Sequence, residues 1–406
     1  MKRLLGSAAW LLVLAACHSQ TQPTTADASA TPPGPATKPP AAVADSPGAS
    51  YRVYRGLLPG EADSITLHLV SAPQPRYDSE GISRVGSYYG ADGHPYEMQS
   101  LSSAPDSVAL TDISYEHSIP DVYGPTWRLK LQPNGDLAGT VGGQAVRLRQ
   151  IAPAVGALTF AVRCLADSLA AYPGKPKSPK ARMYLQALVP MGGPAALAAN
   201  VLRDLRGDTL GGLPAPTLPK LYQQQRDTFY HGYRTDIADL LANTPADERP
   251  TETLNYDEQS GASVLFHQGN LLSLAFFGYS YSGGAHGLGG TTVASYDLRT
   301  GRRLYYDDIF QPTAKAQLLP LLEQTVRALF KMKPGEPLDE QLLVTKIPIT
   351  HNVCLTSGGA LFVYEPYEIA SYAQGEVRVF VPLAQLRGLL REGLPLPGAA
   401  SGVAVR

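Results

Sequence analysis

A long segment of this 406-residue chain alternates apolar and polar residues in short runs separated by turn-forming dipeptides. Trp127, Leu129 and Leu131 alternate with basic residues, and Asn134-Gly135 follows before the next apolar run. A period of two places alternate side chains on one face of a strand, and Asn-Gly favours a tight hairpin. We therefore expect residues 51–152 to form a small all-β module, either an antiparallel meander or a small barrel.

After residue 155 the apolar residues take the spacing of helices. Leu318, Leu322 and Val326 recur at intervals of four, which predicts a helix over 313–331. The other expected elements are a short helix between Pro194 and Gly207, a helix over 217–243 with the stripe Leu221, Phe229, Tyr233, Ile237 and Leu241, strands over 263–281, 290–298, 351–356, 360–364 and 376–381, and a short helix after Pro382. We expect residues 155–395 to form an α+β domain with a mostly antiparallel sheet and packed helices.

The start of the chain resembles a bacterial lipoprotein signal. Lys2 and Arg3 precede an apolar run, and Leu14-Ala15-Ala16-Cys17 matches the lipobox. The resemblance implies that residues 1–16 are a signal peptide that is removed before Cys17, and that Cys17 is then lipidated. The apolar run is too short to span a bilayer, so residues 1–16 are not expected to be a transmembrane helix. An ordinary secretory signal is the alternative. We expect the mature protein to be held on a membrane outside the cytoplasm by its N-terminal lipid.

The segment that follows the signal has the composition of a linker. Residues 18–50 contain seven prolines and no leucine, isoleucine or aromatic residue. Such a segment cannot bury a core, so residues 17–50 are expected to be a disordered tether. His18 stands where an aspartate would favour retention in the inner membrane, so the sequence favours the outer membrane of a two-membrane bacterium.

Charge and cysteine content limit the classes of partner. The formal net charge is −1 and the chain has no basic stripe, so we expect no nucleic-acid partner. Besides Cys17 there are two cysteines, Cys164 and Cys354, which form one disulfide or remain two separate thiols. Metal-ligand spacings such as C-x-x-C or H-x-x-x-H do not occur, so we expect no metal site and no other cofactor.

One glycine-rich segment invites a catalytic interpretation. Residues 277–287 read FGYSYSGGAHG, but a nucleophile elbow needs glycine where Ser282 stands. A phosphate loop would need a lysine and a following helix. We expect a strand to end at Gly283-Gly284, because glycines allow a bend that a Cβ would block. His286 is then expected to lie in the bend among tyrosines as a structural residue, with a catalytic role as the alternative.

Several motifs in the second half of the chain resemble the RsiV-like extracytoplasmic domain. They are Gly278–His286, Tyr296–Gly301, Asp307–Phe310, Pro366–Gly375 and Val379–Pro382. The chain departs from the family pattern at Glu365, where asparagine is common, and at Ser371, where proline is common. The resemblance spans about residues 155–390 and implies that the α+β domain is of this family.

The resemblance implies a binding function without catalysis. The family binds lysozyme in anti-sigma factors and also occurs beside peptidoglycan deacetylase domains. We therefore expect an envelope protein that binds a protein partner, such as a lysozyme-like muramidase, and that recognises or inhibits it. Two alternatives remain open: a module that binds peptidoglycan or a small ligand, and a hydrolase that uses His286 with a nearby carboxylate.

The candidate binding or structural residues come from these motifs. They are Tyr279, Tyr281, Gly283, Gly284, His286, Asp308, Tyr367, Glu368 and Tyr372. The tyrosines either belong to the core or form a contact surface, for which tyrosine offers a large area at a small entropic cost. Asp308 stands before a predicted helix, where a carboxylate stabilises the N-terminal end, so a structural role is favoured over an acid–base cluster with His286 and Glu368.

Overall fold

The computed structural model describes residues 46, 48–75, 80–100, 104, 106–114, 124–207, 213–243 and 252–397. The predicted signal peptide, Cys17 and nearly all of the predicted tether lie outside the described residues. Among the described helices, none combines the length and the apolar character needed to cross a bilayer.

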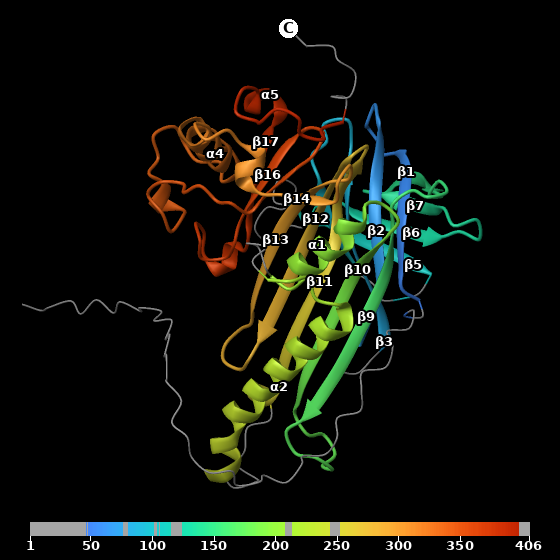
Figure 1. Ribbon diagram of the computed structural model, residues 1–406, viewed down its shortest axis with the longest axis vertical. Coiled ribbons are helices and arrows are strands. Elements are labelled where there is room, and N and C mark those ends of the chain that lie inside the picture. The colour runs from blue at the N-terminus through green and yellow to red at the C-terminus, as the bar shows by residue number, and fades with distance from the viewer. Residues whose placement is uncertain are drawn as a thin grey trace, which may run out of the picture. The chain divides into compact units, whose positions relative to one another are not determined.

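The first part of the described chain is a closed antiparallel barrel of eight strands (Figure 1). In order around the barrel the strands are β1 (Ser50–Leu57), β2 (Ser64–Pro75), β3 (Glu80–Tyr89), β4 (Tyr96–Ser100), β5 (Ser107–Asp112), β6 (Thr126–Leu131), β7 (Leu137–Val141) and β8 (Gln144–Ile151). Strand β1 pairs with both β2 and β8, which closes the ring. The prediction of an all-β meander or barrel is confirmed.

Alternation along the strands fills the barrel interior. The inward side chains Leu67, Leu110, Trp127, Leu129 and Leu148 are each at most 1% exposed and belong to one apolar cluster. Residues that alternate with them point outward, so the period of two seen in the sequence separates the two sides of the barrel wall.

The second part of the chain is built on a six-stranded sheet. The strands are β9 (Thr159–Ala170), β10 (Lys180–Met191), β11 (Tyr256–Gln268), β12 (Leu271–Tyr281), β13 (Leu288–Asp297) and β14 (Arg302–Leu304), and their order is β14-β13-β12-β11-β10-β9. The pair β10–β11 is parallel, and all other neighbours are antiparallel. The expected mostly antiparallel sheet is therefore present, although the sequence interpretation missed β9 and β10.

Helices cover one face of this sheet. Figure 1 shows α1 (Ala195–Leu205) and α2 (Leu218–Asn243) in front of the strands, and both are inserted in the crossover between β10 and β11. Helix α1 begins after Pro194, and Gly207 ends it with a φ of 85°, as expected. The buried residues Leu197 and Leu221 join the apolar side of β10, so the helix stripes face the sheet.

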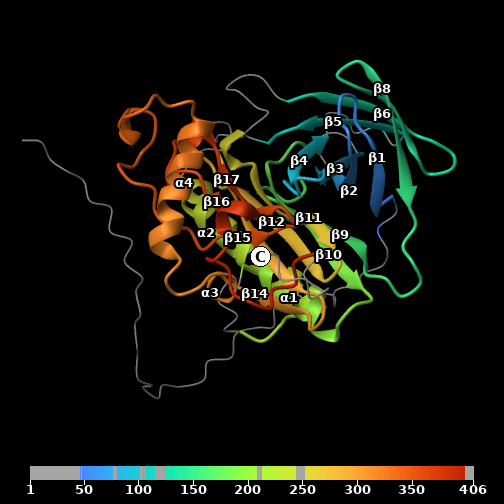
Figure 2. The ribbon, with the colours of Figure 1, turned by 90° about the horizontal axis from the view of Figure 1, so that it is seen from above.

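A smaller sheet completes the fold. Its strands are β15 (Val353–Leu355), β16 (Gly359–Tyr364) and β17 (Val377–Pro382); the accompanying helices are α3 (Tyr306–Ile309), α4 (Lys315–Leu329) and α5 (Leu383–Leu386), with short 3-10 turns η1 (Glu252–Leu254), η2 (Leu338–Glu340) and η3 (Tyr372–Gln374). Figure 2 shows α4 and the barrel well apart, with β11 and β12 between them. The described chain is mostly β, so the α+β expectation holds only in part.

Barrel and six-stranded sheet are in direct contact on the face that the helices leave free. The Ser87 hydroxyl of β3 lies 2.8 Å from the carbonyl oxygens of Val264 and Leu265, and the Tyr184 hydroxyl donates to the Pro73 carbonyl at 2.9 Å. The barrel contacts β11 and the β9 edge of the sheet, and this arrangement positions the candidate site described below.

Candidate functional site

The glycine-rich segment forms the bend between β12 and β13, as expected. Gly283 and Gly284 have φ values of 88° and 89°, in the left-handed region that glycine favours. The Tyr281 hydroxyl donates to the Gly284 carbonyl at 3.0 Å and closes the turn. The bend lies beside the start of β11, because a Cβ on Gly283 would lie 3.2 Å from the Thr253 carbonyl.

Beyond the bend, His286 joins a stack of aromatic rings. Its ring lies 4.0 Å from that of Tyr372, centroid to centroid, and the Tyr367 ring lies 5.9 Å from Tyr372 on stacked planes. Both the Tyr372 hydroxyl and His286 Nδ1 contact the Gly287 carbonyl oxygen, at 2.8 and 2.9 Å. Because a carbonyl only accepts, the contact requires the proton on Nδ1. We call His286, Tyr367 and Tyr372 the aromatic surface.

The backbone at Tyr367 is unusual for a tyrosine. Its φ is 71° and its side chain is 53% exposed, while its amide donates to the Ala370 carbonyl at 2.9 Å. Non-glycine residues adopt this region at a cost, and such positions cluster at binding sites. Glu368, one residue on, accepts a hydrogen bond from the Glu365 amide at 3.1 Å, so its carboxylate supports the same turn.

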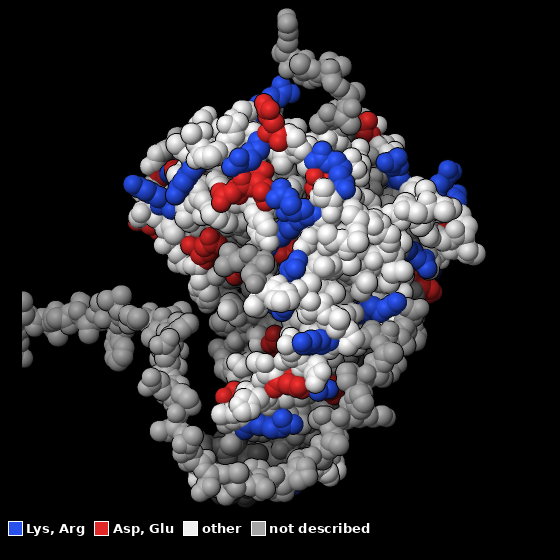
Figure 3. Space-filling model, viewed as in Figure 1, with Lys and Arg blue, Asp and Glu red and all other residues white. Residues whose placement is uncertain are grey.

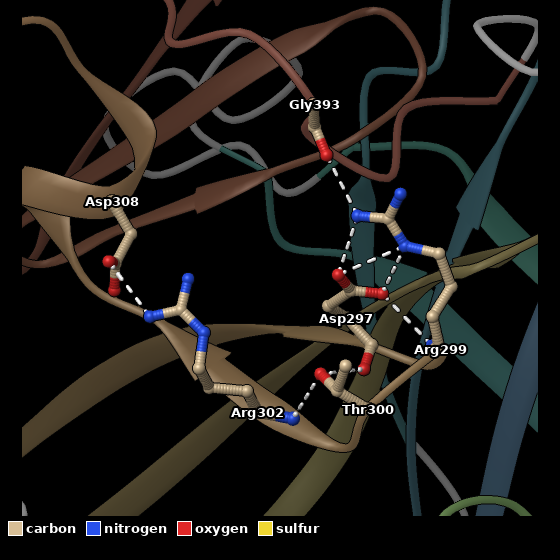
Figure 4. Close-up of polar contacts among 6 residues, drawn as sticks. All are labelled: Asp297, Arg299, Thr300, Arg302, Asp308 and Gly393. Atoms are coloured by element: carbon tan, nitrogen blue, oxygen red, sulfur yellow. Dashed lines mark hydrogen bonds and ion pairs between the residues drawn. The ribbon is translucent and has the colours of Figure 1, made fainter.

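Asp308 lies away from the aromatic surface. It follows the end of β13 that carries Asp297, whereas His286 precedes the opposite end. Figure 4 shows the Asp308 carboxylate paired with Arg302 at 2.8 Å; it also accepts from the Tyr305 amide at the start of α3. The structure therefore does not bring Asp308 together with His286 and Glu368 as an acid–base cluster. Asp308 has a structural role, but it caps α3 and not the predicted helix over 313–331.

The motif Asp297-Leu298-Arg299-Thr300-Gly301 shapes the neighbouring turn (Figure 4). Asp297 accepts from Arg299 Nη2 at 2.6 Å, and the same guanidinium nitrogen donates to the Gly393 carbonyl at 2.8 Å. Hydrogen bonds from this side chain hold the pKa of the Asp297 carboxyl below its usual range. The contacts are all within the protein, so the motif connects the β13–β14 turn to the C-terminal segment.

Cys164 and Cys354 are both free thiols, so the disulfide that the sequence left open is not formed. Cys164 lies on the edge strand β9 beside the hydroxyl of Tyr184, at 3.5 Å. Cys354 is fully buried on β15 among apolar residues, and burial raises the pKa of its thiol to about 12. Within the described ranges, no group of three or more His, Cys, Asp or Glu side chains could hold a metal ion.

A groove that the sequence did not predict lies on the free face of the six-stranded sheet. It has a volume of about 1320 Å³ and is walled by the barrel on one side and by the 366–378 segment on the other. Its floor contains Arg182, Asp257, Gln259, Phe277 and Tyr279. These residues come from β10, β11 and β12, so the groove exists only once three distant segments pair.

Two glycines allow the aromatic rings of the floor to lie on the sheet. A Cβ on Gly261 would lie 2.3 Å from the Phe277 ring, and one on Gly287 would lie 2.4 Å from the Tyr279 ring. Gly261 is the direct partner of Phe277 across β11 and β12. The rings therefore occupy the space that side chains would fill. The alternation of Phe277 and Tyr279 was the one signal in the sequence for this floor.

A buried ion cluster closes one end of the groove. Arg378 of β17 pairs with Glu97 of β4 and, at 2.7 Å, with Glu376. Their side chains are only 18%, 14% and 17% exposed, in that order. Burial raises the pKa of the Glu376 carboxyl to about 7, opposed by hydrogen bonds from Thr291, and lowers that of Arg378 to about 10. The cluster joins the barrel to the smaller sheet.

Charges on the opposite side of the molecule are mixed. Figure 3 shows Lys and Arg side chains interspersed with Asp and Glu on the face that carries α1 and α2. The visible face has no continuous surface of one sign.

Comparisons with known proteins show a similarity over part of the chain. Residues 307–384, which run from α3 to α5, match the family described as "Protein of unknown function (DUF3298)". The crystal structure of a DUF3298 family member from Bacteroides fragilis is similar, with a TM-score of 0.51 and 25% identity, over 58% of this chain and 94% of that one. A DUF3298 family protein from Pseudomonas aeruginosa PAO1 has a TM-score of 0.43 and 18% identity, over 58% and 95%. No curated protein matches the chain.

Proposed function

We propose that this protein is a non-enzymatic lipoprotein of the cell envelope that binds a protein partner through the aromatic surface. The observation that carries the proposal is the stack of His286, Tyr372 and Tyr367, which is accessible and held in place from both ends. Tyr372 and His286 are fixed on the Gly287 carbonyl, and Tyr367 is fixed by its turn.

Rigid, exposed aromatic rings favour protein recognition. Tyrosine buries a large apolar area on binding and loses little conformational entropy, particularly where its ring is already ordered. Residues of this kind often contribute most of the binding energy of an interface. The left-handed backbone of Tyr367 supports the same conclusion, because the protein maintains a costly conformation at an exposed residue.

The contacts of His286 favour binding over catalysis. A general base must be oriented by a partner and must lie near a nucleophile or a substrate proton. Here Nδ1 contacts a backbone carbonyl and the ring stacks on a tyrosine, while Asp308 lies beyond the far end of β13. Asp308 therefore does not serve as the nearby carboxylate that the hydrolase alternative requires of His286.

The resemblance to the RsiV-like domain supplies the class of partner. Its last two motifs, Pro366–Gly375 and Val379–Pro382, fall inside the matched DUF3298 region and include Tyr367 and Tyr372. We propose a lysozyme-like muramidase as the partner, bound and inhibited by this surface. Lipidation of Cys17 and the 17–50 tether would then present the surface outside the cytoplasm, at the outer membrane.

A direct binding measurement tests this proposal. The full chain, immobilised through a C-terminal tag, is exposed to c-type lysozyme as wild type and as Tyr367→Ala. We expect saturable binding that weakens at least tenfold in Tyr367→Ala, while Tyr305→Ala, an exposed tyrosine near the other end of β13, binds as wild type. Absence of lysozyme binding, or equal binding by both variants, would remove the support for this partner.

A further inference from the structure

We propose that the groove between the barrel and the six-stranded sheet binds an uncharged oligosaccharide in extended form. The groove adjoins the aromatic surface, because Tyr372 lines both, but the floor residues are different and the inference does not rest on the proposed protein-binding function. It is drawn from the chemistry of the floor, its charge balance and its position on a sheet face.

The floor offers flat apolar platforms. Phe277 and Tyr279 follow each other on the same face of β12, about 7 Å apart at the strand rise of about 3.3 Å per residue. Each ring lies over a glycine. The face of an aromatic ring carries negative charge density, which attracts the weakly positive C–H groups that line one face of a sugar ring. Two platforms in a row suit successive sugars of one chain.

Planar polar groups lie next to these rings. Gln259 Nε2 donates to Asp257 Oδ2 at 2.9 Å, and Asp257 faces Arg182 across the β10–β11 pair. Amide, carboxylate and guanidinium groups each present two or more hydrogen-bonding atoms in one plane, so that one side chain can bond two neighbouring hydroxyls. Aromatic faces together with planar polar groups match a ligand that alternates C–H faces with hydroxyl edges.

The charge of the groove excludes a polyanion. Its charged lining residues are three cations and four carboxylates: Lys180, Arg182, Arg378, Glu97, Asp167, Asp257 and Glu376. Glu97 and Glu376 both pair with Arg378, and Asp167 lies 3.9 Å from Arg226. Nucleic acid or a sulfated glycan would need a surplus of positive charge, so a neutral ligand fits best.

The position of the groove disfavours a peptide. An extended peptide gains affinity by adding a strand to a free sheet edge. The floor strands β11 and β12 are internal, and their backbone groups are already paired on both sides; the edge strand β9 contributes only Ala166, Asp167 and Ser168 to the lining. The volume of about 1320 Å³ exceeds the range of roughly 300–1,000 Å³ that is usual for a drug-sized ligand, which leaves room for several sugar rings.

Calorimetric titration of the full chain tests the inference. The probes are chitohexaose, cellohexaose and maltohexaose as neutral chains, heparin hexasaccharide as a polyanion, and an uncharged hexapeptide. We expect at least one neutral hexasaccharide to bind more tightly than its own disaccharide. Stronger binding of heparin or of the peptide, or no binding of any neutral chain, would overturn the proposal.

Variants locate the site. Phe277→Ala should weaken binding of the neutral hexasaccharide at least tenfold, and Phe277→Tyr, which keeps the ring, should restore it. Gln259→Leu keeps the size of the side chain, removes its amide and should also weaken binding, which covers the case that Phe277→Ala does not fold. Tyr367→Ala should leave this affinity unchanged and weaken only lysozyme binding, so the two proposals can fail separately. Wild-type affinity in a folded Gln259→Leu and a folded Phe277→Ala would overturn the assignment.

Discussion

Replacement of Arg378 by methionine should be among the most damaging single changes in this protein. The guanidinium lies between Glu97 of the barrel and Glu376, which directly precedes β17, and all three side chains are less than one-fifth exposed. Methionine keeps much of the length of the side chain and removes its charge, which leaves two buried carboxylates unbalanced. Breaking a buried pair in this way typically costs about 3–5 kcal/mol of unfolding free energy.

The loss of unfolding free energy in Arg378→Met should increase with pH, because Glu376 is deprotonated as the pH rises. Burial raises the folded-state pKa of Glu376 from 4.5 to about 7, so the folded protein holds a proton that the unfolded chain has released. The contribution of Glu376 to the free energy of unfolding is therefore complete below about pH 4.5 and is lost as the pH rises through 7. At about 1.36 kcal/mol per pKa unit, this loss amounts to roughly 3 kcal/mol. Without the cation, the pKa of Glu376 should rise further, and the fall in stability between pH 5 and 8 should steepen.

Urea unfolding at pH 5, 6, 7 and 8 measures both effects, with Arg327→Met as the matched control. Arg327 pairs with Glu323 one helical turn away, where the side chains are 30% and 38% exposed, and it donates to the Glu336 carbonyl at 2.7 Å, so its loss should cost about 1–2 kcal/mol. If Arg378→Met is no more destabilising than Arg327→Met, or if its penalty is the same at every pH, the reasoning about the buried cluster is wrong.

The other predictions concern the bend, the histidine and the lipid anchor. Gly284→Val should lower stability by about 1–3 kcal/mol, because its φ is 89° and its surroundings are open, whereas Gly278→Val, equally open at an ordinary φ, should cost less in thermal melts. His286→Ala removes one hydrogen bond and one stacked ring, so it should cost about 1–2 kcal/mol in urea unfolding and should also weaken lysozyme binding; wild-type stability in this variant would show that the ring has no structural role. Cys17→Ala should abolish lipidation, and its normal fractionation with membranes at unchanged gel mobility would contradict the lipoprotein assignment.

The barrel could be predicted because its strands have one covered and one open face for most of their length. Leu129 and Trp127 point into the core while Arg128 and Lys130 point out, so the alternation is visible in the sequence. Exceptions are His68 and Val70 on β2, which alternate as outward residues yet are each only 1% exposed. The six-stranded sheet covers this side of β2, and such a contact cannot be predicted from the residues near β2 in the sequence.

Strand β10 was missed for the same physical reason, whereas β9 alternates over Phe160 and Val162 and is exposed from Ala166 to Ser168. Residues Met183 to Leu188 of β10 are all buried, because helices cover one face and the barrel approaches the other. A strand covered on both faces loses its period of two and cannot be distinguished from a buried helix by pattern alone. The flanking elements α1 and α2, exposed on one side, kept their helical stripes and were predicted.

The same distinction between local and long-range contacts applies to the candidate site. The aromatic surface could be anticipated, because its residues lie in two short motifs that the sequence already sets apart. The groove could not, because Arg182, Gln259 and Phe277 come from three strands, and their register decides which side chains share a face. A site whose residues come together only when distant strands pair cannot be predicted from local sequence patterns.

The barrel gives the sheet both its core and its groove. Ser87 anchors β3 on the carbonyls of Val264 and Leu265, next to the bulge that interrupts the β11–β12 register after Val264. On one side of this contact the free face of the sheet is apolar and is covered by the barrel and, over Leu265, Ala275 and Val293, by the smaller sheet. On the other side the same face carries Gln259 and Asp257, and the aromatic rings of β12 lie over glycines. A barrel that covered the whole face would leave no groove, and a sheet without the barrel would expose an apolar surface, so the partial overlap of the two is what makes a ligand site physically available here.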